Sequence, residues 1–113
     1  MKYQQRDIVE VNFLFPDGTL KVHPAIIVSN NQLQDDEFGL VYLVLITSKG
    51  LINPQYSYPL KEEMLVNCTF AKPSFVKCQI IAGYTDRDIL RRVGSIKQQY
   101  FDEIVDKIIE SIF

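Results

Sequence analysis

The seven residues from Leu40 to Ile46 are all apolar. A strand with one face in water alternates apolar and polar residues, whereas a continuous apolar run of this length is typical of a strand covered on both faces. The run therefore predicts a central strand with other parts of the chain packed on each side. This requirement restricts the fold to an arrangement with at least two packed layers.

Other segments have the alternation, or the β-branched and aromatic content, of strands. They are Ile8–Leu14, Leu20–Ser29, Tyr56–Leu60, Leu65–Thr69 and Ser74–Ala82. The first alternates so that Val9, Val11 and Phe13 are expected to point inward. Between the first two lies Phe15–Thr19, which has the Pro, Asp and Gly of a tight turn and so predicts a hairpin.

Two polar segments are predicted to lie outside the sheet. Asn30–Gly39 contains three consecutive acids, but no second set of ligands is spaced to complete a cation site, so a solvated loop is expected. Thr85–Gly94 has aspartates at positions that cap helices and a closing glycine. This pattern predicts a capped turn or short helix that stops at Gly94.

The chain ends in its clearest helix. Ser95, followed three residues later by Gln98, matches the capping box that begins many helices. Apolar residues then recur at helical spacing, as a stripe that is expected to be core or dimer surface. The stripe consists of Tyr100, Phe101, Ile104, Val105, Ile108, Ile109 and Ile112. Many short strands with one terminal helix predict a mainly β (α+β) fold, a small barrel or two packed sheets, in a single domain over residues 1–113.

The charge balance does not suggest a strongly basic nucleic-acid binder. The chain has 12 basic and 14 acidic side chains and a net charge of -2. Four acids face two lysines from Lys97 onward, which leaves ten basic and ten acidic side chains before it and allows a locally positive face. Cys68 and Cys78 are expected to be reduced thiols. No run approaches the roughly 18 apolar residues of a membrane span, and residues 1–7 lack a signal-peptide core.

Chemically useful side chains surround His23, the only histidine. It precedes Pro24, which cannot donate a ladder hydrogen bond and is expected at a strand start or an edge. The central apolar run ends in Thr47 and Ser48, followed by Lys49. Pairing of these two strands would bring an imidazole and a hydroxyl cluster together at one rim of the β-structure.

Such a set suits cleavage of RNA without metal. A general base removes the proton of the ribose 2′-hydroxyl, a general acid protonates the leaving oxygen, and cations or hydroxyls stabilise charge on the phosphate. Imidazole titrates near neutrality, and Thr47 can donate a hydrogen bond to a phosphate oxygen. A structural histidine, or a Ser-His-Asp site using Ser48, are the alternatives. The sequence has no Gly-rich phosphate loop and no Cys/His metal set, so no cofactor or metal is expected.

Six short blocks stand in an order typical of one protein family. They are Arg6–Val11, Asp17–Gly18, His23–Ser29, Ile46–Ser48, Lys72–Lys77 and Val93–Ile96. In order and spacing the chain resembles the MazF/PemK-like toxins, ribosome-independent endoribonucleases (mRNA interferases) of bacterial type II toxin–antitoxin systems. The resemblance implies an SH3-like barrel with a C-terminal amphipathic helix and a cytoplasmic homodimer that cleaves single-stranded RNA sequence-selectively to a 2′,3′-cyclic phosphate. It also implies inhibition by a cognate antitoxin whose disordered segment occupies the RNA groove.

The resemblance also assigns residues. Thr47 falls on the family's catalytic threonine, and His23 falls where the family has its catalytic arginine. Arginine is a permanent cation with a bidentate fork for phosphate, whereas a neutral imidazole offers one donor. His23 is therefore expected to act as the acid/base in a pH-dependent, slower enzyme; the alternative is an inactive barrel that binds RNA or a protein partner as a dimeric module. The expected substrate contacts are Lys21, Ser48, Lys49 and Gln79.

A second departure from the family lies in the strand Ser74–Ala82. Alternation places Lys77 and Gln79 on one face of it. Some members carry a charged residue before the glutamine and an arginine shortly after it, where this chain has Cys78 and Ile81. The resemblance therefore does not assign the RNA sequence that would be cut.

Overall fold

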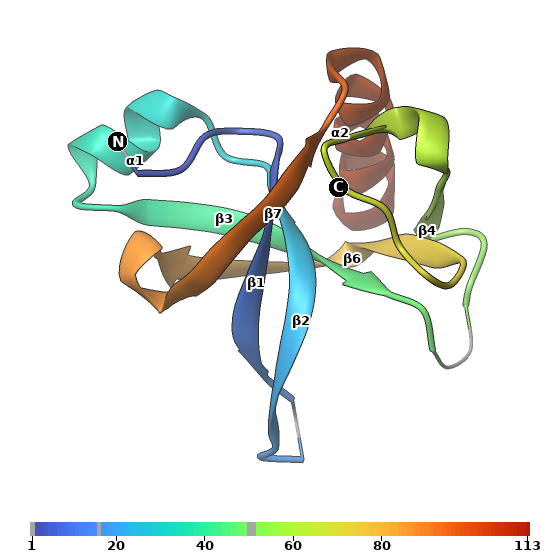
Figure 1. Ribbon diagram of the computed structural model, residues 1–113, viewed down its shortest axis with the longest axis horizontal. Coiled ribbons are helices and arrows are strands. Elements are labelled where there is room, and N and C mark those ends of the chain that lie inside the picture. The colour runs from blue at the N-terminus through green and yellow to red at the C-terminus, as the bar shows by residue number, and fades with distance from the viewer. Residues whose placement is uncertain (1, 16, 50–51) are drawn as a thin grey trace.

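The computed structural model describes residues 2–15, 17–49 and 52–113. Within them, seven strands form one antiparallel sheet in the order β4-β6-β3-β2-β1-β7-β5. The strands are β1 (Asp7–Leu14), β2 (Leu20–Ile27), β3 (Leu40–Thr47), β4 (Ser57–Leu60), β5 (Leu65–Val66), β6 (Ser74–Thr85) and β7 (Ile89–Ile96). The helices are α1 (Asn31–Asp36) and α2 (Gln98–Ile112), and the short 3-10 turns are η1 (Glu62–Met64) and η2 (Asp86–Asp88). The strongly curved sheet with its terminal helix confirms the predicted mainly β, barrel-like fold (Figure 1).

The central strand β3 is buried on both faces, as its apolar run predicts. Val44 and Ile46 belong to one apolar cluster, which the sheet shares with α2. Val41 and Leu43 alternate with them and belong to a second cluster. Phe13, which was expected to point inward, is only half-buried. It lies near the tip of the β1–β2 hairpin, which projects away from the rest of the sheet (Figure 1).

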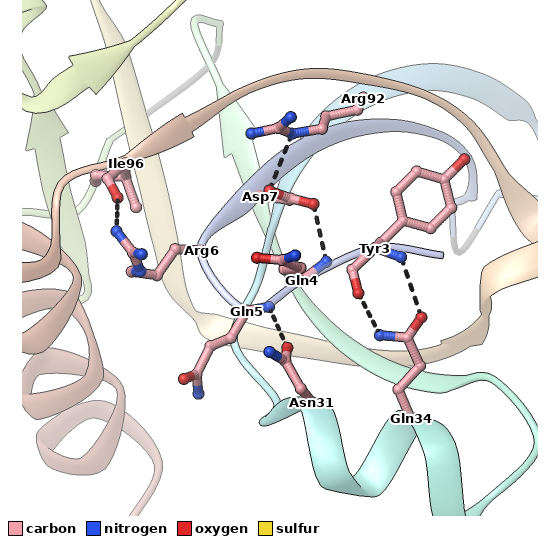
Figure 2. A network of polar contacts seen from close by, with 9 residues as sticks. All are labelled: Tyr3, Gln4, Gln5, Arg6, Asp7, Asn31, Gln34, Arg92 and Ile96. Carbon is pink, nitrogen blue, oxygen red and sulfur yellow. Dashed lines mark hydrogen bonds and ion pairs between the residues drawn. The ribbon is translucent and has the colours of Figure 1, made fainter. Parts of the chain in front are cut away.

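The segment Asn30–Gly39 is not the solvated loop that its acids predicted, because it contains α1. The side chain of Asn30 caps this helix by accepting a hydrogen bond from the N–H of Leu33 at 2.8 Å. Gln34 is buried and forms two hydrogen bonds with the backbone of Tyr3: its amide donates to the carbonyl at 2.6 Å, and its oxygen accepts from the N–H at 3.2 Å (Figure 2). The helix is therefore stabilised by a contact with the N-terminal segment, which residue spacing does not reveal.

The start of β1 is tied to β7 as well (Figure 2). Arg6 has a φ of 79°, and its guanidinium donates to the Ile96 carbonyl at 3.2 Å. The buried carboxylate of Asp7 accepts from Nε of Arg92 at 3.0 Å and from the N–H of Gln4 at 2.9 Å. These contacts hold the first residues of the chain across the β1–β7 pair.

Of the two structures predicted for Thr85–Gly94, the capped turn is present and the helix ending at Gly94 is not. In the turn, the N–H and hydroxyl of Thr85 both donate to Asp88, at 3.0 Å, and lower the pKa of that carboxyl. The chain then continues as β7, and Gly94 is buried within it. The predicted capping box is wrong for the same reason, since Ser95 belongs to β7 and α2 begins after Lys97, whose side chain makes no capping hydrogen bond.

Gly94→Ala is expected to lower the free energy of unfolding by about 1–3 kcal/mol. A Cβ at this position would lie 2.6 Å from Sγ of Cys68 and 2.6 Å from the carbonyl oxygen of Val66, and the backbone oxygen cannot rotate away. Urea denaturation measures the change. Gly83→Ala is the matched control, because its Cβ meets only side-chain atoms, the nearest in the Tyr42 ring at 3.3 Å, and a change within about 0.5 kcal/mol is expected. Equal losses for the two variants would show that the close contact at Gly94 is not what matters.

None of the helices in the part of the chain that the structure describes is both long and apolar enough to span a bilayer. Cys68 and Cys78 are both free. Burial raises the pKa of the Cys68 thiol and raises that of Cys78 to about 11.

Candidate functional site

The pairing between β2 and β3 covers only part of each strand and stops before the start of β2 and the end of β3. It joins Ala25–Ile27 to Leu43–Leu45, although β2 begins at Leu20. Pro24 has no N–H with which to continue the ladder toward β3. Pro24 was expected at a strand start or at an edge. It does not lie at the start of β2, but it lies where this strand has a locally free edge.

The two strands separate beyond this point, and a cavity of about 340 Å³ opens between them. The β2–β3 register, carried two residues further, brings His23 opposite Thr47. The residues that line the cavity are Lys21, Val22, His23, Pro24, Ile46, Thr47, Ser48, Lys49, Phe70 and Ser74. The structure thus brings together five of the six predicted site residues, all except Gln79.

The imidazole of His23 is partly buried and held from two sides. Its Nδ1 lies 3.4 Å from the carbonyl oxygen of Ile46, and its ring stands edge-on to the ring of Phe15 with the centroids 5.2 Å apart. When Nδ1 carries the proton, it donates to this carbonyl and leaves Nε2 as an acceptor. In that tautomer the ring can accept a proton from a bound molecule.

Thr47 ends β3 and is 8% exposed. Its hydroxyl donates to the carbonyl of Lys49 at 3.2 Å and accepts from the N–H of the same residue at 3.3 Å. Both distances are at the long end for hydrogen bonds, so these contacts are weak. The hydroxyl is therefore positioned by the turn after β3 but can exchange its present partner for a stronger acceptor, such as a phosphate oxygen.

A second cavity, of about 480 Å³, shares several walls with the first. It is lined by Phe15, Asp17, Thr19, Lys21, His23, Leu45, Thr47, Lys49 and Lys77. Its carboxylate, Asp17, is already engaged by the hydroxyl of Thr19 at 2.6 Å and the N–H of Thr19 at 2.9 Å. These hydrogen bonds hold the pKa of Asp17 below its usual value. Three lysines and one occupied carboxylate suit this cavity to an anion.

Lys77 was not predicted as a site residue, and a bulge explains why. Strand β6 pairs Val76 with Ile46 but Ile81 with Val44, so the four residues 77–80 stand opposite Leu45 alone. A bulge of this kind redirects side chains and breaks the alternation of a strand. Lys77 consequently lines the second cavity, whereas Gln79 is exposed and lines neither. Phe70 and Ser74 were missed as well, because only the folded chain brings them to the cavity.

Among the described residues, no group of three or more His, Cys, Asp and Glu side chains could hold a metal ion. The two cavities offer an imidazole, hydroxyls and ammonium groups. Those groups can bind an anion and exchange protons with it.

The model of the PemK-like, MazF-like toxins of type II toxin–antitoxin systems matches residues 4–112. The chain belongs to this family. A comparison of this toxin with curated protein sequences found no match. Solved structures with the same fold include MazF (Form-I) from Deinococcus radiodurans, with a TM-score of 0.72 and 15% identity over 94% of this chain and 92% of that one.

Two mycobacterial structures have the same fold as this MazF-like toxin. One is an endoribonuclease in complex with its cognate antitoxin, with a TM-score of 0.67 and 14% identity over 96% of this chain and 93% of that chain. The other is the Mycobacterium tuberculosis toxin MazF-mt6, with a TM-score of 0.65 and 18% identity over 95% and 92%. At these identities the structures establish the fold alone.

Proposed function

We propose that this MazF/PemK-like toxin is a metal-independent, sequence-selective endoribonuclease that cleaves single-stranded RNA. The 2′-hydroxyl attacks the adjacent phosphate and the product carries a 2′,3′-cyclic phosphate. One observation carries this proposal: His23 and Thr47 line the same cavity, together with Lys21 and Lys49. An acid/base and a hydroxyl donor among cations are what phosphodiester cleavage needs in the absence of metal.

In this proposal His23 moves the proton. Neutral imidazole takes the 2′-hydroxyl proton at Nε2 while the bond from O2′ to phosphorus forms. The imidazolium then gives this proton to the 5′-oxygen as the bond from phosphorus to O5′ breaks, so the histidine returns to its first state. Thr47 donates a hydrogen bond to a non-bridging phosphate oxygen, and Lys21, Lys49 and Lys77 offset the charge that builds there.

The proposal extends to partners. Solved structures that share this fold include MazE–MazF complexes from Deinococcus radiodurans and the mycobacterial endoribonuclease with its antitoxin. We infer that this chain acts as a homodimer that binds RNA along its interface and is inhibited by a cognate antitoxin. The cytoplasm is the compartment where such an enzyme would meet its RNA.

A non-catalytic module is the second candidate, and one observation favours it. His23 offers a single donor to phosphate when neutral, where an arginine would present a permanent, forked cation. The same cavities would then bind RNA without cutting it.

Incubation of the native protein with a long single-stranded RNA in EDTA, from pH 5 to pH 9, tests the proposal. We expect fragments that end in a 2′,3′-cyclic phosphate, and no cleavage of DNA with the same base sequence, because deoxyribose lacks the attacking hydroxyl. Cleavage that requires an added divalent metal, or that proceeds equally well on DNA, would disprove this mechanism. Binding of RNA without cleavage at any pH would favour the module.

A further inference from the structure

Two contacts orient the imidazole of His23, and one of them is too long to fix it alone. The distance of 3.4 Å from Nδ1 to the carbonyl oxygen of Ile46 exceeds the usual range of about 2.7–3.2 Å for such hydrogen bonds. A hydrogen bond this weak leaves the ring able to turn. The second contact is the ring of Phe15, whose centroid lies 5.2 Å away and whose plane is inclined by 63°. The orientation of the imidazole therefore depends on Phe15 as well as on the carbonyl.

The backbone of Phe15 is held by the turn at the tip of the β1–β2 hairpin. Its N–H donates to the carbonyl of Thr19, and its carbonyl accepts from the N–H of Gly18, both at 2.9 Å. Gly18 has a φ of 88°, in the left-handed region that favours glycine. Asp17 accepts from both the N–H and the hydroxyl of Thr19. The tip is thus a closed turn, which gives Phe15 a fixed starting point.

The ring of Phe15 is held by packing. Its centroid lies 5.0 Å from that of Phe13, with the two planes at 66°. The ring of Phe13 in turn lies 6.5 Å from that of Tyr84, with the planes at 42°. Aromatic side chains prefer inclined arrangements at these separations. The four rings form a row, which begins at Tyr84 near the end of β6 and ends at His23 in β2.

We propose that Phe15 is a positioning residue for the acid/base of this toxin. Its ring holds the plane of the His23 imidazole so that Nδ1 keeps its hydrogen bond to the Ile46 carbonyl. A neutral imidazole has a single N–H, so a proton on Nδ1 leaves Nε2 as the acceptor. Nε2 is the atom that takes the 2′-hydroxyl proton in the reaction proposed above, and the inference rests on that proposed function.

An imidazole needs such a support because it can fail through its orientation alone. If the ring turns away from the carbonyl, nothing favours the proton on Nδ1, and the nitrogen that faces the substrate can carry an N–H where an acceptor is required. The hydrogen bond that one ring nitrogen makes is what sets the role of the other. Phe15 would thus act on the reaction through His23, without touching the atoms that react.

Nuclear magnetic resonance of the free protein tests this directly. His23 is the only histidine, so in protein without a histidine tag its ring signals are unambiguous. The nitrogen chemical shifts of the ring are recorded without RNA at pH 9, well above the usual titration range of imidazole. Protonated and unprotonated ring nitrogens differ strongly in shift, so these values give the ratio of the two neutral tautomers. We expect the Nδ1–H tautomer to predominate in the native protein.

Phe15→Leu is expected to lower the ratio of the Nδ1–H to the Nε2–H tautomer by about 2- to 10-fold, as the loss of one aromatic pair would. The single-turnover rate at saturating RNA is expected to fall in proportion to the remaining Nδ1–H population. Phe15→Tyr keeps the ring and is expected to stay within about 2-fold of the native ratio and rate. Phe13→Leu is the matched control, because it removes the same atoms from the same hairpin but from a ring that packs on Phe15. A smaller change is expected for it.

The proposal is overturned if the native protein holds mainly the Nε2–H tautomer, a result that needs no variant. It is also overturned if Phe15→Leu, shown to be folded by its melting curve, keeps the native ratio, or if Phe13→Leu changes the ratio as much. A protein that cleaves no RNA but shows the expected ratios would support the positioning of His23 and disprove the ribonuclease. Cleavage by the native protein with an unchanged ratio in Phe15→Leu would do the reverse.

Discussion

Replacement of His23 by alanine is expected to lower the rate of RNA cleavage by about 10²- to 10⁴-fold, the usual contribution of a positioned acid/base. The imidazole lines both cavities at the point where β2 leaves β3, and no second histidine exists in the chain to take its place. Single-turnover cleavage in EDTA measures the rate. A melting curve checks that the variant is folded, which is expected because His23 is only partly buried.

His23→Arg distinguishes the two roles that a cation and an acid/base can play. Guanidinium is a permanent, forked phosphate ligand but does not titrate between pH 5 and pH 9. We expect this variant to lose about as much rate as His23→Ala, because a permanent cation cannot take the 2′-hydroxyl proton. A retained rate without the native pH dependence would instead assign this position the role of a phosphate-binding cation. Activity in His23→Arg with none in the native protein would identify a toxin fold disarmed at this residue. If His23→Ala and Thr47→Ala are both folded and both cleave RNA at the native rate, the assignment of these residues to the site is wrong.

Replacement of Ile104 by alanine is expected to lower the free energy of unfolding by about 2–5 kcal/mol, the cost of emptying part of a packed core. Ile104 is fully buried in the cluster that α2 shares with the sheet. Denaturant unfolding followed by circular dichroism measures the loss. In a small domain this loss is a large share of the total stability.

Ile109→Ala is the control on the same helix. Its side chain is 51% exposed although it belongs to the same apolar stripe, so a loss below about 1 kcal/mol is expected. Similar losses for the two variants would mean that Ile109 is covered in solution, as it would be if the stripe formed part of a dimer surface. A small loss for both would mean that α2 contributes little to the core.

The elements that could be predicted from the sequence are those whose pattern is repeated over many residues. The apolar run of β3 and the stripe of α2 each contain enough apolar positions for burial alone to decide the structure. By contrast, tertiary contacts determine the structure of two short polar segments, Asn30–Gly39 and Thr85–Gly94. Gln34 holds α1 through the backbone of Tyr3. Gly94 lies within β7, where its lack of a side chain allows the close approach of Val66 and Cys68.

Part of the candidate site could likewise be predicted from the sequence, and part could not. The pairing of the strands that carry His23 and Thr47 could be inferred because each residue adjoins a strongly apolar segment. The contribution of Lys77 could not, because it depends on four residues of β6 standing opposite Leu45. Strand alternation places Lys77 and Gln79 together, whereas in the structure only Lys77 lines one of the two cavities. A break in periodicity of this kind is decided by the paired strand and leaves no mark in the sequence of β6.

The missing N–H of Pro24 bears on how this fold combines a stable sheet with an accessible cavity. An enzyme commonly admits its substrate through a segment that moves, at the cost of a less stable region. Here the opening lies where the β2–β3 ladder ends at Ala25, while the β1–β2 ladder continues on the other side of β2 to Leu20. The opening thus begins at a residue that has no N–H to offer a further strand, and the same strand that pairs with β1 from Ile26 to Leu20 also lines the cavity.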